Sequence, residues 1–225
     1  MILDIIRNGF SMNTVINLLA RVFVVFCTMP VHEYAHALVA TKLGDDTARL
    51  KGRLTLAPLA HIDLIGALMI FIVGFGYGKP VPINPRRFKN PKAGMALTAL
   101  AGPVSHIIMA LFFMVLCNIS FMIYNSTELL FANVSYSFFL FASQINVSLA
   151  VFNFLPVPPL DGSRIINLII PSKYYFKIMQ YERYIVLAVF ALIFFGILDG
   201  PLSFVSGLVM RVVSYVASLP FRLFL

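Results

Sequence analysis

The sequence predicts an all-α protein that crosses a membrane several times. Of its 225 residues, 60% are hydrophobic and only 12% are charged, and the mean hydropathy is +0.91. Soluble domains carry about 25% charged residues, so the composition alone indicates a membrane protein. Several apolar runs approach the length of about 20 residues that a helix needs to cross hydrocarbon. The basic residues gather in the loops between these runs.

Four segments are predicted to span the membrane as helices. They lie at residues 15–41, 93–117, 133–154 and 184–200. The second opens with small residues, which let helix backbones approach closely in lipid. The third ends in the sequence NFLPVPPLDG, and Asp199, Gly200 and Pro201 stop the fourth. We expect residues 1–225 to form a single membrane domain, because no long linker or internal repeat divides them.

Positive charge in the loops predicts the orientation of the chain. Lysines and arginines are abundant in 42–92 and 162–183, whereas 118–132 contains none. Cytoplasmic loops carry the excess of Lys and Arg, so the first two regions are predicted to be cytoplasmic and the third external. The apolar run 64–77 has basic residues on both sides, so we expect a re-entrant segment rather than a crossing. Residues 202–219, with Arg211 and scattered serines, indicate an interfacial helix.

The net charge, the two cysteines and the first apolar run each exclude an alternative interpretation of the sequence. The net charge of +8 arises from loops between apolar segments, so it indicates topology and no nucleic-acid partner. Cys27 and Cys117 both lie inside apolar runs and form no disulfide framework. The first apolar run carries ionisable groups that a cleaved segment would not keep, so we expect it to be retained rather than removed as a signal peptide.

Those ionisable groups form the motif HEYAH, in which His32, Glu33 and His36 lie within a predicted spanning helix. Ionisable residues inside a membrane are costly and therefore indicate function. Two histidines four residues apart project from the same helix face and can bind one Zn²⁺. Glu33 lies about 100° further round the helix, so it can reach a metal-bound water without being a ligand. A pair of hydrogen-bonded core histidines is the structural alternative.

Catalytic zinc sites use three protein ligands, so the sequence must supply one more. His61, His106 and Asp161 are the remaining candidates, and Asp161 is favoured because the prolines before it break the helix and free the chain to turn inward. His36 lies six residues before Lys42, about 9 Å along a helix. Asp161 lies three residues before Arg164. Both halves of the site are therefore predicted inside the membrane but nearer its cytoplasmic face.

HEYAH in the first span and NFLPVPPLDG at the end of a later one resemble the site-2 protease family of intramembrane zinc metalloproteases (peptidase family M50). The stretches GRLTLAPLAHID, KPVPINPRRFKNP and LAGPVSH contribute to the resemblance, which extends from about residue 22 through 165. It implies a three-helix catalytic core at 15–41, 93–117 and 133–154, with short strands or a re-entrant segment between the first two. The spanning helix at 184–200 is additional to that core.

The resemblance also implies the roles of particular residues. His32, His36 and Asp161 would bind one Zn²⁺ per chain, and Glu33 would activate the zinc-bound water as nucleophile. Asn153 would help bind the substrate backbone or the oxyanion. The family commonly has GPxxN in its middle helix, whereas this chain has His106 at that asparagine, so His106 is a second candidate for substrate or oxyanion contact. Ala57 likewise replaces an asparagine of the family's loop motif.

The implied activity is hydrolysis of peptide bonds in transmembrane substrate helices. We expect a multi-pass protein of a bacterial inner or plasma membrane, with a transmembrane protein or peptide as substrate, in a small form without a PDZ or CBS domain. The sequence leaves the oligomeric state open. A membrane metal transporter or sensor using the same histidines remains an alternative, although transporters favour redundant ligands and inverted repeats. A non-proteolytic scaffold with this fold is the other alternative.

Overall fold

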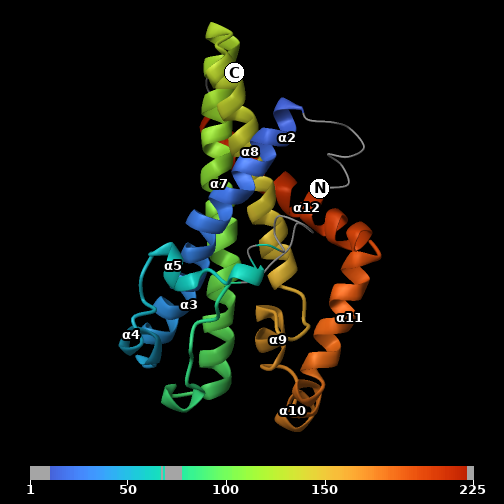
Figure 1. Ribbon diagram of the computed structural model, residues 1–225. Helices are drawn as coiled ribbons and strands as arrows, with labels where there is room; N and C mark the ends of the chain where they lie inside the picture. The colour runs from blue at the N-terminus through green and yellow to red at the C-terminus, as the bar shows by residue number, and fades with distance from the viewer. Residues whose placement is uncertain (1–10, 67, 69–77, 222–225) are drawn as a thin grey trace.

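The computed structural model describes residues 11–66, 68 and 78–221, and within these ranges all regular structure is helical. Two long helices, α7 and α8, run side by side in opposite directions through the middle of the molecule (Figure 1). The α-helices are α2 Met12–Phe23, α3 Met29–Lys42, α4 Thr47–Leu50, α5 Pro58–His61, α7 Pro91–Thr127, α8 Leu130–Asn153, α9 Asp161–Ile166, α10 Ser172–Gln180, α11 Glu182–Phe194 and α12 Asp199–Ser218. Short 3₁₀ turns lie at Pro85–Arg87 and Leu219–Phe221.

The first spanning segment is a single helical rod that widens once along its length. A π-helical turn at Val24–Thr28 joins α2 to α3. Pro30 follows two residues later, and a proline can neither donate a hydrogen bond to the preceding turn nor fit its ring against that turn. The wider π turn relieves this conflict, and the Thr28 hydroxyl donates to the carbonyl of Val24 at 3.0 Å. The rod therefore continues through the proline and carries the histidine motif on α3.

Within the described residues, four helical segments are long and apolar enough to cross a membrane: Met12–Lys42, Pro91–Thr127, Leu130–Asn153 and Asp199–Phe221. The first three cover the predicted spans closely at 15–41 and 133–154, but α7 continues to Thr127, ten residues beyond the predicted end at 117, so most of the predicted external loop 118–132 is helical. At the C-terminal end the structure differs from the prediction, because α11 has 13 residues and a length of only about 20 Å. Gly196, with a φ of +70°, follows the end of α11 before Asp199 is reached. The segment predicted to be interfacial thus has the spanning length instead.

The helices are held together by an apolar core that also contains polar contacts. One cluster joins α7, α8, α11 and α12 through Met114, Val151, Ile193 and Leu202. The buried hydroxyl of Ser143 on α8 donates to the Ala110 carbonyl of α7 at 2.8 Å. This bond gives the buried Ser143 hydroxyl a partner that it would otherwise lack between α7 and α8. α7 and α8 therefore form a fixed central helix pair for the rest of the fold.

The connection between α3 and α7 is held against α3 by two buried polar side chains. The Asp45 carboxylate accepts hydrogen bonds from the backbone N–H of Thr47 at 3.0 Å and of Asn84 at 2.6 Å, and from the Thr47 hydroxyl. Burial opposes ionisation of Asp45, but these bonds outweigh it and lower the pKa of its carboxyl below the ordinary value. His61 donates from Nε2 to the Thr55 carbonyl at 2.7 Å.

No strand occurs in the described part of this connection. Residues 80–84 have no regular secondary structure. The predicted re-entrant segment 64–77 lies mostly outside the described residues. Its described residues 64–66 are helical, and the Asp63 carboxylate caps this turn by accepting hydrogen bonds from the N–H groups of Ile65 and Gly66, both at 3.0 Å.

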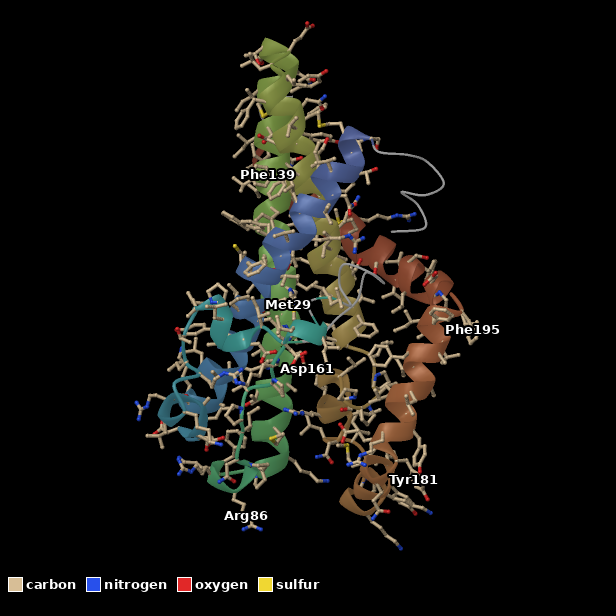
Figure 2. All side chains as sticks on the ribbon, viewed as in Figure 1. Met29, Arg86, Phe139, Asp161, Tyr181 and Phe195 are labelled. Atoms are coloured by element: carbon tan, nitrogen blue, oxygen red, sulfur yellow. The ribbon has the colours of Figure 1, made fainter. Side chains whose placement is uncertain are left out.

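The two ends of the helix bundle differ in their content of lysine and arginine. The connection between α3 and α7 and the α9–α10 region lie at one end, and the short turn between α7 and α8 lies at the other (Figure 1). Arg86 and Tyr181 mark the first end in Figure 2, with Asp161 and Met29 between them and Phe139. The basic loops 42–92 and 162–183 thus share one end, as a single cytoplasmic side requires.

Candidate metal centre

Two of the candidate ligands come from one face of α3. His32 and His36 are each about 6% exposed, and their Nε2 atoms lie 3.0 Å apart. His36 uses its other ring nitrogen, Nδ1, to donate to the Thr98 carbonyl of α7 at 2.7 Å. A partner of this kind fixes the ring orientation and leaves Nε2 free for a metal ion. The helix spacing therefore places both rings on one face of α3, and the bond to α7 fixes the orientation of the His36 ring.

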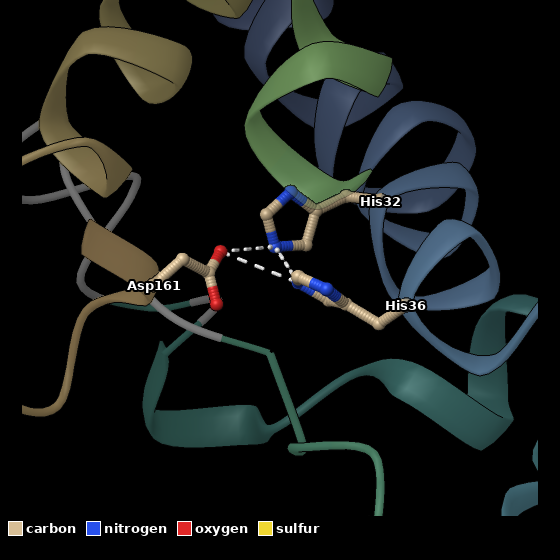
Figure 3. A group of neighbouring side chains, drawn as sticks. All are labelled: His32, His36 and Asp161. Atoms are coloured by element: carbon tan, nitrogen blue, oxygen red, sulfur yellow. Dashed lines mark hydrogen bonds and ion pairs between the residues drawn. The ribbon is translucent and has the colours of Figure 1, made fainter. Parts of the chain in front are cut away.

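The third candidate reaches this point from the other side of α7. α8 ends at Asn153, the proline-rich turn follows, and α9 begins at Asp161. A Cβ atom at Gly162 would overlap the backbone at the end of α8, namely Phe154 and the Leu155 carbonyl oxygen. Glycine therefore lets α9 pack directly against that end. This close packing carries Asp161 toward the two histidines (Figure 3).

The three side chains have the geometry of a zinc site. The Asp161 Oδ2 atom lies 3.4 Å from Nε2 of His32 and 3.3 Å from Nε2 of His36. Donor atoms held tetrahedrally at about 2.0–2.1 Å from Zn²⁺ are about 3.3 Å from one another, which matches this triangle closely. Oδ2 of Asp161 is buried and has no other hydrogen-bond partner within the described residues. The donor set, two imidazoles and a carboxylate, is also one that zinc accepts.

Gly102 brings α7 into direct contact with the histidine rings. A Cβ at this position would overlap Cε1 of His32 and both Cε1 and Nε2 of His36. The helix therefore approaches the candidate metal ligands more closely than any other residue type would allow. The sequence signalled this only indirectly, through the run of small residues that opens the second span.

Glu33 lies beside the triangle but does not belong to it. It is about 6% exposed, and its carboxylate accepts a hydrogen bond from the backbone of Val81. A Cβ at Gly78 would lie 3.1 Å from its Oε1 atom, so the chain passes close to the carboxylate here as well. The connection between α3 and α7 thus forms one wall around Glu33.

A cavity of about 410 Å³ opens onto the side chains of His32, Glu33, His36 and Asp161. Its other walls come from Val81 and Ile83 of the connection between α3 and α7, the proline turn, and apolar residues of α11. Asn153, the last residue of α8, also lines it. The cavity therefore combines the three clustered donors, the neighbouring carboxylate and the candidate substrate-binding amide.

His106, the second candidate for substrate or oxyanion contact, lies next to the His32 ring. It is fully buried, and its ring centroid lies 4.7 Å from that of His32. Its Nδ1 atom bonds Oδ1 of Asn146 at 2.8 Å, and Asn146 in turn donates to the Ala142 carbonyl. His106 does not line the cavity. It supports the His32 ring from behind, and Asn146, which the sequence did not single out, completes that support.

His61 lies apart from the ligand triangle. Its ring bonds the Thr55 carbonyl through Nε2, and Arg53 donates to its Nδ1 at 3.5 Å. Its backbone carbonyl accepts from the amide of Lys79 at 2.8 Å. His61 therefore ties parts of the connecting loop together, and Asp161 is the one of the three sequence candidates that meets His32 and His36.

Comparison with known proteins points to a single family. The model of peptidase family M50 matches residues 117–197, a region that contains Asn153 and Asp161 but not the histidine motif. The chain is 42% identical over 167 residues to "Putative zinc metalloprotease YwhC" of Bacillus subtilis, covering 72% of this chain and 74% of YwhC. It is 31% identical over 136 residues to "Putative zinc metalloprotease Rip2" of Mycobacterium tuberculosis, covering 59% of this chain and half of Rip2. No solved structure matches the chain.

Proposed function

This chain belongs to peptidase family M50, the zinc metalloproteases of the site-2 type, and from that premise we propose that it is an intramembrane endopeptidase. Its substrates would be transmembrane helices, cut at peptide bonds within the bilayer. The observation that carries this proposal is the buried triangle of His32, His36 and Asp161, which opens onto a cavity inside helices of membrane-spanning length.

In this proposal His32, His36 and Asp161 hold one zinc ion per chain. The match of their donor atoms to tetrahedral spacing supports this assignment, as does the burial of Asp161 Oδ2, which within the described residues pairs with no group other than the two histidines. The Thr98 carbonyl holds His36 in the tautomer that presents Nε2. When bound, zinc supplies a water molecule of lowered pKa and polarises the scissile carbonyl.

Glu33 is the general base in this proposal. Its carboxylate lies in the same cavity, one residue from a ligand and outside the ligand triangle. It would take the proton from the attacking water and then deliver that proton to the leaving amine nitrogen. Asn153 would hydrogen-bond the substrate backbone or the developing oxyanion, because it lines the cavity whereas His106 lies behind His32.

The substrate must be partly unwound for this chemistry. In a transmembrane helix every backbone carbonyl is hydrogen-bonded, so attack requires a locally extended segment. The cavity volume of about 410 Å³ accommodates a few residues rather than a whole helix. The site lies nearer the basic end of the bundle, which we propose is the cytoplasmic side, so cleavage would occur toward that face.

The test is cleavage by the purified protein in proteoliposomes. Wild-type protein loaded with zinc is incubated with a panel of single-pass transmembrane peptides, and products are identified by mass. We expect cleavage within the hydrophobic segment, inhibition by a zinc chelator, and a loss of at least about 100-fold in Glu33→Gln. Glu33→Gln is expected to keep one zinc per chain, measured by metal analysis. Zinc flux without any product, in both forms, would instead support a metal transporter.

A further inference from the structure

Arg164 places a positive charge in the active-site cavity. It is the one lysine or arginine among the described residues that line this cavity. It lies on α9, three residues after Asp161, and residues at that spacing share nearly the same helix face. Its side chain is half-buried. A guanidinium group therefore sits about one helical turn from the candidate metal ligand.

This guanidinium group has no partner in the part of the chain that the structure describes. Neither Glu33 nor Asp161 forms an ion pair with it, although both line the same cavity. Other arginines of this end are engaged, since Arg49 pairs with Asp46 at 3.0 Å and Arg53 donates to the Lys79 carbonyl. Arginine offers five donors in a planar fork that suits a carboxylate, and all of them remain available here.

The surroundings of Arg164 strengthen its interaction with an anion. Val186, Val189 and Phe190 of α11 form an apolar wall of the cavity. An ion pair in such a place is screened less than one at an open surface. Arg164 therefore presents a guanidinium group to the cavity beside this apolar wall, an arrangement that suits an anionic group of a substrate.

We propose that Arg164 is a specificity-determining residue that binds a carboxylate of the substrate close to the scissile bond. One helical turn is about 5.4 Å, and an extended substrate advances about 3.3 Å per residue. The carboxylate thus lies about two residues from the cleaved bond. It is either an acidic side chain within the substrate or the free α-carboxylate of a chain that already ends there. This inference rests on the proposed protease function, because it places the carboxylate relative to the bond that is cut. Binding of the carboxylate can still be measured without cleavage.

The experiment uses three peptides that share one apolar sequence. The first peptide has Glu at one chosen position near the cleavage point and an amidated C-terminus. The second has Gln at that position and a free C-terminal carboxylate two residues from the cleavage point. The third has Gln at that position and an amidated C-terminus. The chosen position is moved residue by residue across the cleavage point. Dissociation constants are measured by fluorescence anisotropy, and kcat and KM by product mass, for zinc-loaded protein in nanodiscs.

Three variants accompany the wild type. Arg164→Gln removes the charge, and Arg164→Lys keeps the charge but loses the planar fork. Arg183→Gln is the matched control, because Arg183 is an exposed arginine of the same end that does not line the cavity. Zinc content is measured in every preparation. The comparison of the three peptides on the wild-type protein tests the proposal even if a variant fails to fold.

We expect the wild type and Arg183→Gln to prefer a carboxylate peptide by about 10- to 100-fold in Kd or KM. Arg164→Gln would lose this preference, while its affinity for the third peptide stays unchanged, and Arg164→Lys would retain part of it. A preference for the first peptide identifies an acidic side chain, and a preference for the second identifies a chain terminus. Equal affinity of the wild type for all three peptides, or an equal loss for all three in Arg164→Gln, would overturn the proposal. Absence of cleavage with preserved carboxylate preference in binding would count against the protease function alone.

Discussion

Replacing Gly102 by alanine tests whether the close approach of α7 sets the geometry of the metal centre. The added methyl group would overlap atoms of both histidine rings, including Nε2 of His36. Restoring ordinary van der Waals contact requires the rings or the helix to retreat by about 1 Å, whereas metal ligands tolerate displacements of about 0.2 Å. Alanine is the better helix former by about 1 kcal/mol, so the backbone itself favours the substitution.

We therefore expect Gly102→Ala to bind zinc at least about 100-fold more weakly, which corresponds to about 2.7 kcal/mol. The assay is competition with a chelator of known affinity, followed by metal analysis of the purified protein. Gly207→Ala on α12 is the matched control, because a Cβ there meets nothing within 4 Å. Zinc affinity in Gly102→Ala equal to that of the wild type and the control would refute the argument that this contact fixes the ligands.

Two further substitutions probe the support of the site and of the loop. His106→Ala removes the ring behind His32 and leaves Oδ1 of Asn146 without its partner, so we expect about 10-fold weaker zinc binding and a broadened visible spectrum of the Co²⁺ form; an unchanged affinity and spectrum would contradict a positioning role. Asp45→Asn removes a buried carboxylate that accepts several hydrogen bonds, so we expect a loss of about 1–3 kcal/mol, measured as faster amide exchange in the loop. Because folding lowers the pKa of Asp45, its contribution is complete above about pH 4 and is lost as the pH falls through the lowered folded-state value. The protection factors of this loop, which compare its exchange rates with those of an unfolded peptide at the same pH, are therefore expected to fall below about pH 4 in the wild type, and that fall should be absent in Asp45→Asn.

Much of the helical architecture follows from local rules. Long apolar runs predicted the first three spanning segments, and helices of matching position occur in the structure. The C-terminal region was harder because Asp199, Gly200 and Pro201 looked like the stop signal for a spanning helix. In the structure the preceding helix ends earlier, beside Gly196, and those three residues begin α12 instead. Proline and an acidic residue are as suitable for the first turn of a helix as for the residues after its end.

The site divides in the same way between local and distant information. The spacing of His32 and His36 brings both rings to one face, because α-helix geometry fixes residues four apart. Which third residue joins them depended on how α9 packs against the end of α8, and Gly162 permits that packing. The sequence ranked Asp161 first, but it could not exclude His61 or His106 by spacing alone. Their places, one in the connecting loop and one behind His32, are properties of the fold.

By itself, the sequence determined that this chain is a helical membrane protein with a zinc-binding motif, since both conclusions rest on composition and on spacing within single helices. The tertiary structure alone decided the contacts between helices. It set Gly102 against the histidine rings, turned the Thr98 carbonyl toward His36, and placed Arg164 in the cavity without a partner among the described residues. These contacts join residues far apart in the chain, and their distances depend on how side chains of different helices fill the space between them.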